Sequence, residues 1–462
     1  MRCATGLTST RVFLGIVAVL VCWLSTFANY AEAQGSQGQN AVCTSSSGCS
    51  TTIGTSAFID ASMFANSPPQ RNICAVLNFI LSSTTYPASG AVIDARGIPG
   101  VTPPVSMTCT ASPWAGITSP PPSTVLLPAG TIAIQVGWVL PSNTHLFGQG
   151  DNIASGTVIQ ACTPSTCTST LSAPPMIQFG SSSGSMAVAI EKLVLDGQGQ
   201  QIGGIVNRYS QSNSYVDHVS LYRILGTGLL IEATGSGPYS NINFDTGNAT
   251  ANSSTVCAQI IGTTGTAGIR GLNCTSELAD ALAAVLLDAS SNSIKDVTIV
   301  GFRNGILVGS NAAATSNVLI NVIGDTTNPC YPTCPTPINA VQISNNNTVT
   351  DLTIIGLSNQ GGGGTFTIED SVTSTTLSAT TDPFVGIYAL GKAANNGHAR
   401  FTTSPTVATW AAGTMAPTST CSQGSLYSCT GGTSGESNCA SGSKYYALWG
   451  CPAPGGTWMA IK

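Results

Sequence analysis

Few side chains in this sequence can exchange a proton, and several of them gather between residues 190 and 245. Three aspartates, a histidine and an arginine are candidate catalytic residues: Asp196, Asp217, His218, Arg223 and Asp245. Other side chains in or near this stretch could bind a substrate through charge or ring stacking: Glu191, Lys192, Tyr222, Tyr239 and Arg270. Carboxylates, an imidazole and cations in one region are the groups that acid–base catalysis needs.

Asp196 and Asp245 could together hydrolyse a glycosidic bond. If two strand spacings separate them, their backbones lie about 9.6 Å apart. That approaches the roughly 6.5–9.5 Å between the carboxyl groups of inverting glycosidases, where one acid protonates the leaving oxygen and the other carboxylate activates water. Both aspartates also precede turn-like sequence with glycine, so turn capping is the alternative for each.

A lyase would use the same region differently. A cation would hold the substrate carboxylate, and His218 or Arg223 would remove the neighbouring proton as a base. Ca²⁺ is a cation that such a lyase could require, and the sequence otherwise predicts no cofactor and no metal site. The alternatives are a solvated His218 and tyrosines that pack at the corners of the fold. His145 lies in Gly/Asn-rich sequence and is interpreted as a loop residue.

A repeated apolar pattern predicts the elements that position these residues. The pattern is apolar-x-x-apolar-x-apolar, repeated at steps of 23 to 32 residues. Its central residues are Leu193, Val219, Ile242, Leu272, Val297, Ile320 and Leu352. The last two apolar residues of each copy point to one face of a strand, while the three-residue step before them requires a bend. The repeat therefore predicts solenoid coils that stack about 4.8 Å apart and bury a continuous apolar row.

Alignment of the coils places polar residues in rows along the strands. One row on the bend contains Glu191, Asp217, Ser240, Arg270, Lys295, Val318 and Thr350. The next row contains Lys192, His218, Asn241, Gly271, Asp296, Leu319 and Asp351. A third row, after the strand, contains Asp196, Tyr222 and Asp245. The alignment brings Glu191, Lys192, Asp217 and His218 into one patch.

These patterns predict an all-β fold, a right-handed single-stranded parallel β-helix. A β-sandwich would instead show hairpin turns every 8 to 12 residues and no repeated central position. Residues 73–81 have apolar side chains at helical spacing, which predicts a short N-terminal helix that caps the open end of the solenoid. Small β modules are expected at the C-terminus. The predicted segments are a signal peptide (1–33), the cap and first coils (34–188), central coils (189–358), a Gly-rich linker (359–364), a small β segment (365–401) and a Cys/Trp-rich module (402–462).

The N-terminal residues have the features of a secretory signal. Arg2 and Arg11 precede an apolar run, and Ala31-Glu32-Ala33 supplies a small-x-small cleavage pattern. An uncleaved membrane anchor is the alternative, because the apolar run is nearly long enough to span a bilayer. We expect a secreted, extracellular or cell-surface protein that has no membrane contact after cleavage.

The low content of charged residues argues against nucleic acid as a partner. Only 7% of the residues are charged and the net charge is −5, whereas about 25% is usual in soluble proteins. Binding to a nucleic-acid backbone needs clustered Lys and Arg, so we expect no nucleic-acid partner.

Cysteine spacing indicates an oxidising compartment. Close neighbours in the sequence predict four local disulfides: Cys43–Cys49, Cys162–Cys167, Cys257–Cys274 and Cys330–Cys334. Other connectivities remain open. Half a zinc site at Cys330 and Cys334 is disfavoured, because neither a histidine nor a second cysteine pair lies nearby in the sequence. Four cysteines and three tryptophans in residues 402–462 suggest a disulfide-tied module that could bind carbohydrate.

Three early segments resemble the opening coils of the pectate-lyase-like superfamily, which includes relatives of the polygalacturonase-type glycoside hydrolases. They are Ala91-Val-Ile-Asp-Ala-Arg-Gly97, Leu126-Leu-Pro-Ala-Gly-Thr-Ile-Ala-Ile134 and Trp138-Val-Leu-Pro-Ser-Asn-Thr-His-Leu-Phe-Gly-Gln-Gly150. The resemblance implies a right-handed parallel β-helix that acts on acidic or neutral polysaccharides along one face. The polygalacturonase pattern also needs Asp-Asp and Gly-His-Gly, and neither occurs in this sequence.

The sequence therefore supports two classes of function. The first is a secreted lyase or glycoside hydrolase that acts on pectin-like or other cell-wall or extracellular glycans, and the local concentration of acid–base groups favours it. The second is a non-catalytic glycan-binding or adhesin-type surface protein that uses the β-helix as a rigid platform. The missing hydrolase motifs favour this second class.

Removal of the signal peptide would take Cys3 and Cys22 with it and leave fourteen of the sixteen cysteines. We expect all fourteen to form disulfides. Reduction should then raise the intact mass of the secreted protein by fourteen hydrogens, and a smaller gain would contradict full pairing.

Overall fold

A computed structural model describes most of residues 57–325 and short strands between residues 339 and 461. The chain divides into two compact units. The first contains Met1–Gln259 and Gly265–Leu278, and the second contains Ile260–Thr264 and Ala279–Lys462. None of the described helices is long and apolar enough to cross a membrane.

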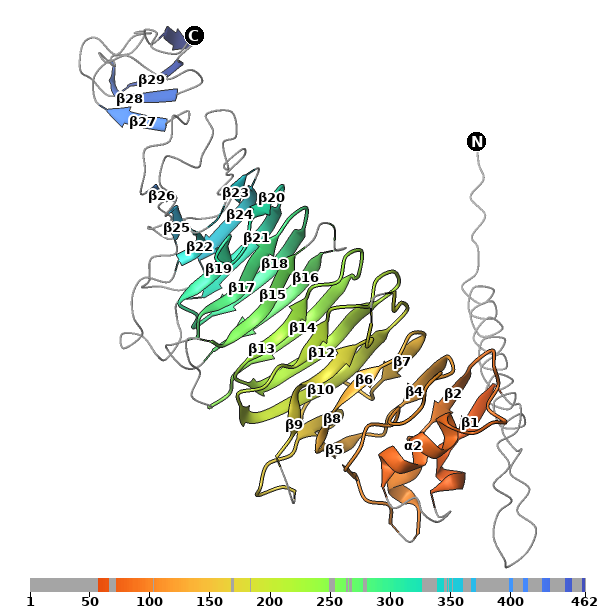
Figure 1. Ribbon diagram of the computed structural model, residues 1–462. Helices are drawn as coiled ribbons and strands as arrows, with labels where there is room; N and C mark the ends of the chain where they lie inside the picture. Colours follow the sequence, from red (N-terminus) through yellow and green to blue (C-terminus); the bar gives the residue numbers. More distant parts are fainter. Residues whose placement is uncertain are drawn as a thin grey trace, which may run out of the picture. The chain divides into compact units, whose positions relative to one another are not determined.

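Parallel strands from successive coils build the first unit (Figure 1). One row is β1 (Phe58–Asp60), β2 (Ala91–Asp94), β4 (Ser123–Leu126), β7 (Thr144–Phe147), β10 (Ala189–Gln200), β12 (Tyr215–Ile224), β14 (Tyr239–Asp245) and β16 (Ile269–Thr275). A second row is β3 (Thr108–Cys109), β5 (Gly130–Ile134) and β8 (Thr157–Ala161), which also pairs with β10. A third is β6 (Val136–Leu140), β9 (Ser172–Phe179), β11 (Ile205–Asn207) and β13 (Thr227–Ile231), and β15 (Val256–Gly262) follows in the chain.

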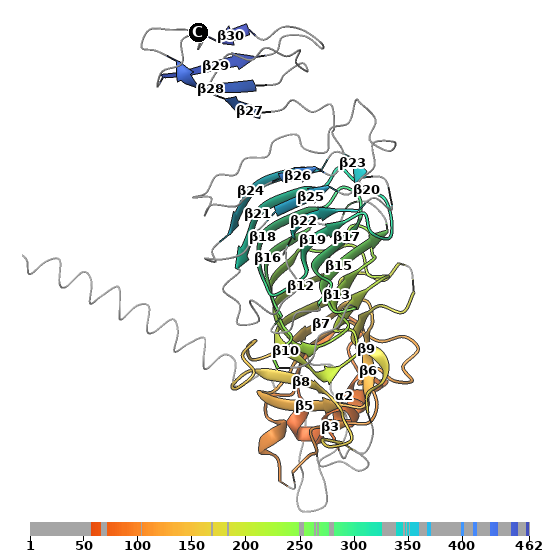
Figure 2. The same cartoon turned by 90° about the vertical axis from the view of Figure 1, so that its left-hand side faces the viewer.

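The chain passes from one row to another and returns, so that each coil adds a strand to the coil before it. β10 pairs with β7 near its start and with β8 further along, so one long strand continues both earlier rows. Figure 2 shows β5 and β8 side by side below β10, with β9 and β6 on another side of the coils. This arrangement confirms the predicted all-β parallel β-helix.

The register in the first unit confirms the repeat. Leu193 lies opposite Val219, Val219 opposite Ile242, and Ile242 opposite Leu272. All four side chains are buried. Stacked apolar rows of this kind supply the core that a single coil could not form by itself.

The predicted bend is a left-handed backbone residue in each coil. Lys192, His218, Asn241 and Gly271 have φ values of 54°, 50°, 52° and 66°. A left-handed residue other than glycine costs roughly 1–2 kcal/mol, and the flanking parallel ladders hold the chain in this conformation. The bend turns Lys192, His218 and Asn241 to the surface, where all three are exposed.

The second unit shows that two sequence alignments were wrong. Its rows are β18 (Ser293–Val300), β21 (Val318–Asp325) and β24 (Thr353–Asn359), and β17 (Ala283–Ala289), β19 (Asn304–Val308), β22 (Asn339–Ile343), β25 (Thr367–Asp370) and β26 (Ala399–Phe401). Val297 pairs with Val322, and Val322 pairs with Leu357, so the central residues are Val322 and Leu357 instead of Ile320 and Leu352. Asn321, with φ 55°, occupies the bend, and asparagine tolerates that conformation better than the predicted Leu319.

Two smaller sheets complete the second unit. β20 (Ala314–Thr315) pairs with β23 (Val349–Thr350), which is why Val349 is buried outside the main repeat. β27 (Trp410–Gly413), β28 (Leu426–Gly432), β29 (Tyr445–Gly450) and β30 (Met459–Ile461) form a four-stranded sheet within the predicted C-terminal module. β25 and β26 lie within residues 365–401 and continue the row of β22. Asn359, predicted to begin the linker, is the last residue of β24, and residues 360–364 lie outside the described residues.

The predicted capping helix is α2 (Ile73–Leu81), near β1 and β2 in Figure 1. Asn72 begins it, because its side-chain oxygen accepts a hydrogen bond from the Ala75 amide at 2.9 Å. Six of its nine residues are buried. A disulfide between Cys74 and Cys109 ties the helix to β3. Its two cysteines are 35 residues apart, so the short cysteine spacings in the sequence did not predict this disulfide.

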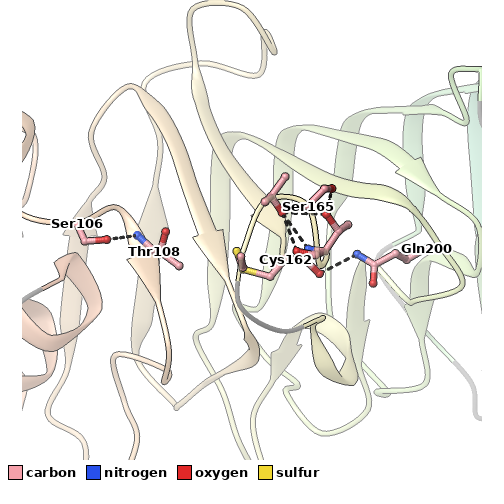
Figure 3. Close-up of a disulfide and its surroundings, with 8 residues drawn as sticks. Ser106, Thr108, Cys162, Ser165 and Gln200 are labelled. Carbon is pink, nitrogen blue, oxygen red and sulfur yellow. Dashed lines mark hydrogen bonds between the residues drawn. A yellow bond between two sulfur atoms is a disulfide. The ribbon is translucent and has the colours of Figure 1, made fainter.

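Two predicted disulfides are confirmed, Cys162–Cys167 and Cys257–Cys274. Figure 3 shows the Cys162 loop, where the Gln200 side chain donates a hydrogen bond to the Cys162 carbonyl at 3.1 Å. The predicted pairs Cys43–Cys49 and Cys330–Cys334 lie outside the described residues, as do the cysteine side chains of the C-terminal module.

The core of the coils should govern stability. Phe244 is fully buried on β14, so Phe244→Ala should lower the free energy of unfolding by about 3–5 kcal/mol. Met186 is 51% exposed, and Met186→Ala should change it by less than about 0.5 kcal/mol. Denaturant unfolding measures both, and equal midpoints for the two variants would contradict the assignment of Phe244 to the core.

Candidate functional site

Three titratable side chains from successive coils converge beside the bend. The Tyr215 hydroxyl on β12 donates a 2.5 Å hydrogen bond to Glu191 Oε1 on β10. His145 Nε2 on β7 lies 3.0 Å from the same oxygen but forms no hydrogen bond with it. Burial, and secondarily the hydrogen bond to Glu191, raises the pKa of Tyr215 to about 12, so this hydroxyl remains a donor at neutral pH.

The register explains why His145 and Tyr215 meet. Both are partners of Ala189, one from the coil before it and one from the coil after it. A small side chain between them leaves room for the two rings, whose centroids are 6.2 Å apart. The sequence analysis assigned His145 to a loop and did not predict that Tyr215 contacts Glu191. A signal was available, because β7 aligns with the start of β10 once the opening coils are included.

Asp217 and His218 form a second group on the same bend. Asp217 Oδ1 accepts hydrogen bonds from Ser240 Oγ at 2.7 Å and from Asn241 Nδ2 at 2.8 Å. Asp217 Oδ2 lies 2.8 Å from His218 Nδ1. Partial burial raises the pKa of Asp217, but the hydrogen bonds from Ser240, His218 and Asn241 outweigh it and leave the pKa below its usual value.

This geometry gives Asp217 and His218 different capacities. The charged carboxylate is surrounded by donors and favours a proton on His218 Nδ1, which leaves Nε2 as the nitrogen that can accept a proton. The His218 side chain is half exposed. The pair therefore presents an oriented base at the surface, while Asp217 acts as the group that positions it.

Cations lie on both sides of this pair along the coil stack. Lys192 occupies the bend one coil earlier, and its ammonium lies 5.0 Å from the centre of the Phe147 ring. Arg270 is exposed and follows Asp217 and Ser240 in the register. We call Glu191, Lys192, Asp217, His218 and Arg270, with His145 and Tyr215, the bend patch. The structure thus confirms the predicted proximity of Glu191, Lys192, Asp217 and His218.

Asp196 lies away from the open surface. Its side chain is only 2% exposed. Arg223 donates two hydrogen bonds, of 3.0 and 2.5 Å, to the Asp196 carboxylate. The side-chain amides of Gln160 and Gln198 also donate hydrogen bonds to this carboxylate. Arg223 in turn packs over the Tyr222 ring, 4.9 Å from its centre. Asp196 and Arg223 therefore stabilise the coils in this arrangement, and the buried Asp196 carboxylate cannot contact a glycan.

Asp245 lies in the predicted register, but its side chain caps a turn. Asp196 pairs with Tyr222 and Tyr222 with Asp245, two strand spacings in all. Each carboxylate caps its own turn. Asp245 accepts a hydrogen bond from the backbone N–H of Gly247 at 2.7 Å, and Asp196 accepts one from the backbone N–H of Gln198 at 3.0 Å. Turn capping, the alternative drawn from the sequence, is the arrangement found for both.

Tyr239 cannot bind a substrate, so that prediction is wrong. Its side chain is completely buried, and its hydroxyl is hydrogen-bonded to Asn207 Nδ2 at 2.8 Å and to Ser236 Oγ at 2.7 Å. Burial raises its pKa to about 12. The left-handed bend at Asn241 places Tyr239 on the inner face of the coil together with Ile242 and Phe244.

A lyase at this site could use Ca²⁺. Within the residues that the structure describes, no group of three or more His, Cys, Asp and Glu side chains is arranged to hold a metal ion. The Asp217 oxygens are already occupied by protein donors. A calcium requirement stays a prediction.

Comparison with known proteins gives limited similarity. No family model matches the chain. No curated protein matches its sequence. Among solved structures, ORF18 of Geobacillus virus E2 aligns with a TM-score of 0.37 and 11% identity, over 88% of this chain and 76% of that chain. The A-module of mannuronan C-5 epimerase AlgE4 from Azotobacter vinelandii aligns with a TM-score of 0.24 and 15% identity, over 54% of this chain and 91% of that chain. The strand register is what establishes the β-helix.

A pair of matched substitutions separates the two aspartates. In Asp196→Asn, one acceptor oxygen becomes a donor that faces Arg223 and the glutamine amides, so the free energy of unfolding should fall by about 1–3 kcal/mol. Asp245→Asn keeps an oxygen for the Gly247 amide and should be close to wild type. Denaturant unfolding compares them, and a wild-type midpoint for Asp196→Asn would show that the buried pair contributes no stability.

Proposed function

We propose that the protein is a secreted polysaccharide lyase that binds acidic glycans on the bend patch. The observation that supports this most is the Asp217–His218 pair, in which a charged carboxylate orients an exposed imidazole. The flanking cations Lys192 and Arg270 suit a substrate that bears carboxylates. The resemblance of the opening segments to the pectate-lyase-like superfamily is consistent with this proposal.

The proposed reaction is a β-elimination. Lys192, one coil from His218, binds the carboxylate of a uronate sugar and stabilises the negative charge that develops on it. Arg270 lies three strand spacings from the coil of Lys192 and binds the carboxylate of another sugar in the chain. His218 Nε2 takes the proton from the ring carbon next to that carboxylate. The electron pair of the broken C–H bond forms a carbon–carbon double bond, and the bond to the departing glycan oxygen breaks. Water returns a proton to that oxygen.

Arg223, the other candidate base, fits this reaction poorly. Its guanidinium is engaged with buried Asp196, and the hydrogen bonds that it donates to Asp196 raise the pKa of Arg223 above its usual value. A guanidinium that holds its proton more tightly is a weaker base. The role therefore falls to His218.

One observation favours hydrolysis as a second candidate. Glu191 and Asp217 are direct partners on adjacent strands, so their backbones lie about one strand spacing, ~4.8 Å, apart. Retaining glycosidases place their two carboxyl groups about 5–5.5 Å apart. Glu191 Oε1 is held by Tyr215, whereas no hydrogen bond among the described residues engages Oε2.

A panel of polygalacturonate, alginate and neutral plant glycans tests the proposal. We expect acidic glycans to give both new reducing ends and the ultraviolet absorbance of unsaturated uronides. His218→Gln should lower kcat by about 10²-fold or more with a smaller effect on KM. Lys192→Gln should raise KM and also lower kcat, because Lys192 both binds the carboxylate and stabilises the charge that develops on it. Arg208→Gln, outside the bend patch, serves as the control.

The other outcomes separate the alternatives. Reducing ends without ultraviolet absorbance indicate hydrolysis, and Glu191→Gln should then abolish activity. Binding without either product indicates a glycan-binding surface protein. Full activity of His218→Gln on a cleaved substrate would remove His218 as the base.

A further inference from the structure

A loop between β7 and β8, Gly148–Gly156, lies at one end of the bend patch. Its first residues join the bend of the next coil, because the Gly148 and Gly150 amides donate to the carbonyls of Glu191 and Lys192, both at 2.9 Å. A Cβ at Gly148 would collide with the Lys192 carbonyl oxygen, so only glycine permits this close approach. The loop therefore begins directly beside the Lys192 end of the patch.

The loop then crosses the outer face of β10. Its Asp151 carbonyl accepts a 2.9 Å hydrogen bond from Ser220 Oγ on β12, which lies one coil beyond β10. Val194 is the partner of Ser220 on β10 and alternates with the inward residues Leu193 and Leu195, yet it is completely buried. A loop that starts before β10 and reaches Ser220 accounts for this burial.

Internal hydrogen bonds fix the shape of the loop. The Asn152 carbonyl accepts from the Gly156 amide at 2.7 Å, and its side chain accepts from the Ala154 amide at 2.8 Å. The Gln149 amide is bound by Thr157 Oγ1 at 2.8 Å. The tip stands out from the coil, because Ile153 is 48% exposed. The loop is thus a fixed wall.

The face is open on the far side of this wall. Asn243 and Asn273, which continue the register from Ser220, are both exposed and are joined by a 2.9 Å hydrogen bond. His218 is two residues from Ser220 on the same strand, so the proposed base lies in the coil where the wall ends. A glycan could extend from His218 along the asparagines but would meet the loop in the other direction.

We propose that the loop Gly148–Gly156 closes one end of the bend patch, so that the protein recognises the end of an acidic glycan chain in preference to its interior. This rests on the proposed function, because it concerns how the same patch selects its substrate. The open asparagine face takes the rest of the chain, and the wall limits binding on the Lys192 side to a short terminal stretch.

Equilibrium titration of the whole protein with two size fractions of polygalacturonate tests this without any need for turnover. The two isotherms should coincide when concentration is expressed as chain ends. A fraction with chains about ten times longer should then bind about tenfold more weakly per unit mass. Isotherms that coincide on the mass scale overturn the proposal but leave the proposed function intact. No binding to any acidic glycan defeats the proposed function, and this inference with it.

Two variants test the wall itself. Removal of Ile153 and Ala154 should let the protein bind the interior of the glycan, so that the two isotherms come closer to coinciding when concentration is expressed as mass. If the protein cleaves the glycan, this deletion should also increase the loss of viscosity per bond cleaved. Ser220→Ala releases the Asp151 carbonyl with little risk to folding and should shift binding in the same direction by a smaller amount. Ser165→Ala, in the separate disulfide loop of Figure 3, is the matched control and should bind as wild type does. If the isotherms of both loop variants still coincide fully when concentration is expressed as chain ends, the proposed role of the loop is overturned.

Discussion

In-register parallel pairing between coils is the constraint on which the rest of the structure depends. Each strand satisfies its backbone groups on the strand before and the strand after it, and each left-handed bend residue lies next to its counterpart in the neighbouring coil. The register stacks like positions about one strand spacing apart. A side chain therefore acquires neighbours from residues that are some 25 positions away in the sequence.

This stacking explains how a chain with so few charges can hold several of them in hydrogen-bonded groups. Asp196 is buried because Arg223, Gln160 and Gln198 come from the same coil or the adjacent coils and surround it with donors. Asp217 remains partly exposed because its donors lie at the bend, where the backbone turns side chains outward. Similar aspartates thus differ in function because one follows a strand and the other lies at a corner.

Much of the fold follows from local sequence signals. Period-two apolar residues beside a bend repeated often enough to predict the β-helix, the first rows and the capping helix. Alignment by apolar pattern failed at Ile320 and Leu352, because several apolar residues in succession gave more than one acceptable phase. The bend residue decided the true phase there, and Asn321 was the better indicator.

The sequence by itself determined the coil architecture and the four central members of the bend patch, because both depend on a repeat that is written in the order of the residues. Only the tertiary structure decided which acidic groups lie at the surface, that His145 and Tyr215 join Glu191, and that the loop Gly148–Gly156 crosses to Ser220. Those features depend on burial and on contacts between coils, and such contacts leave no fixed spacing in the sequence.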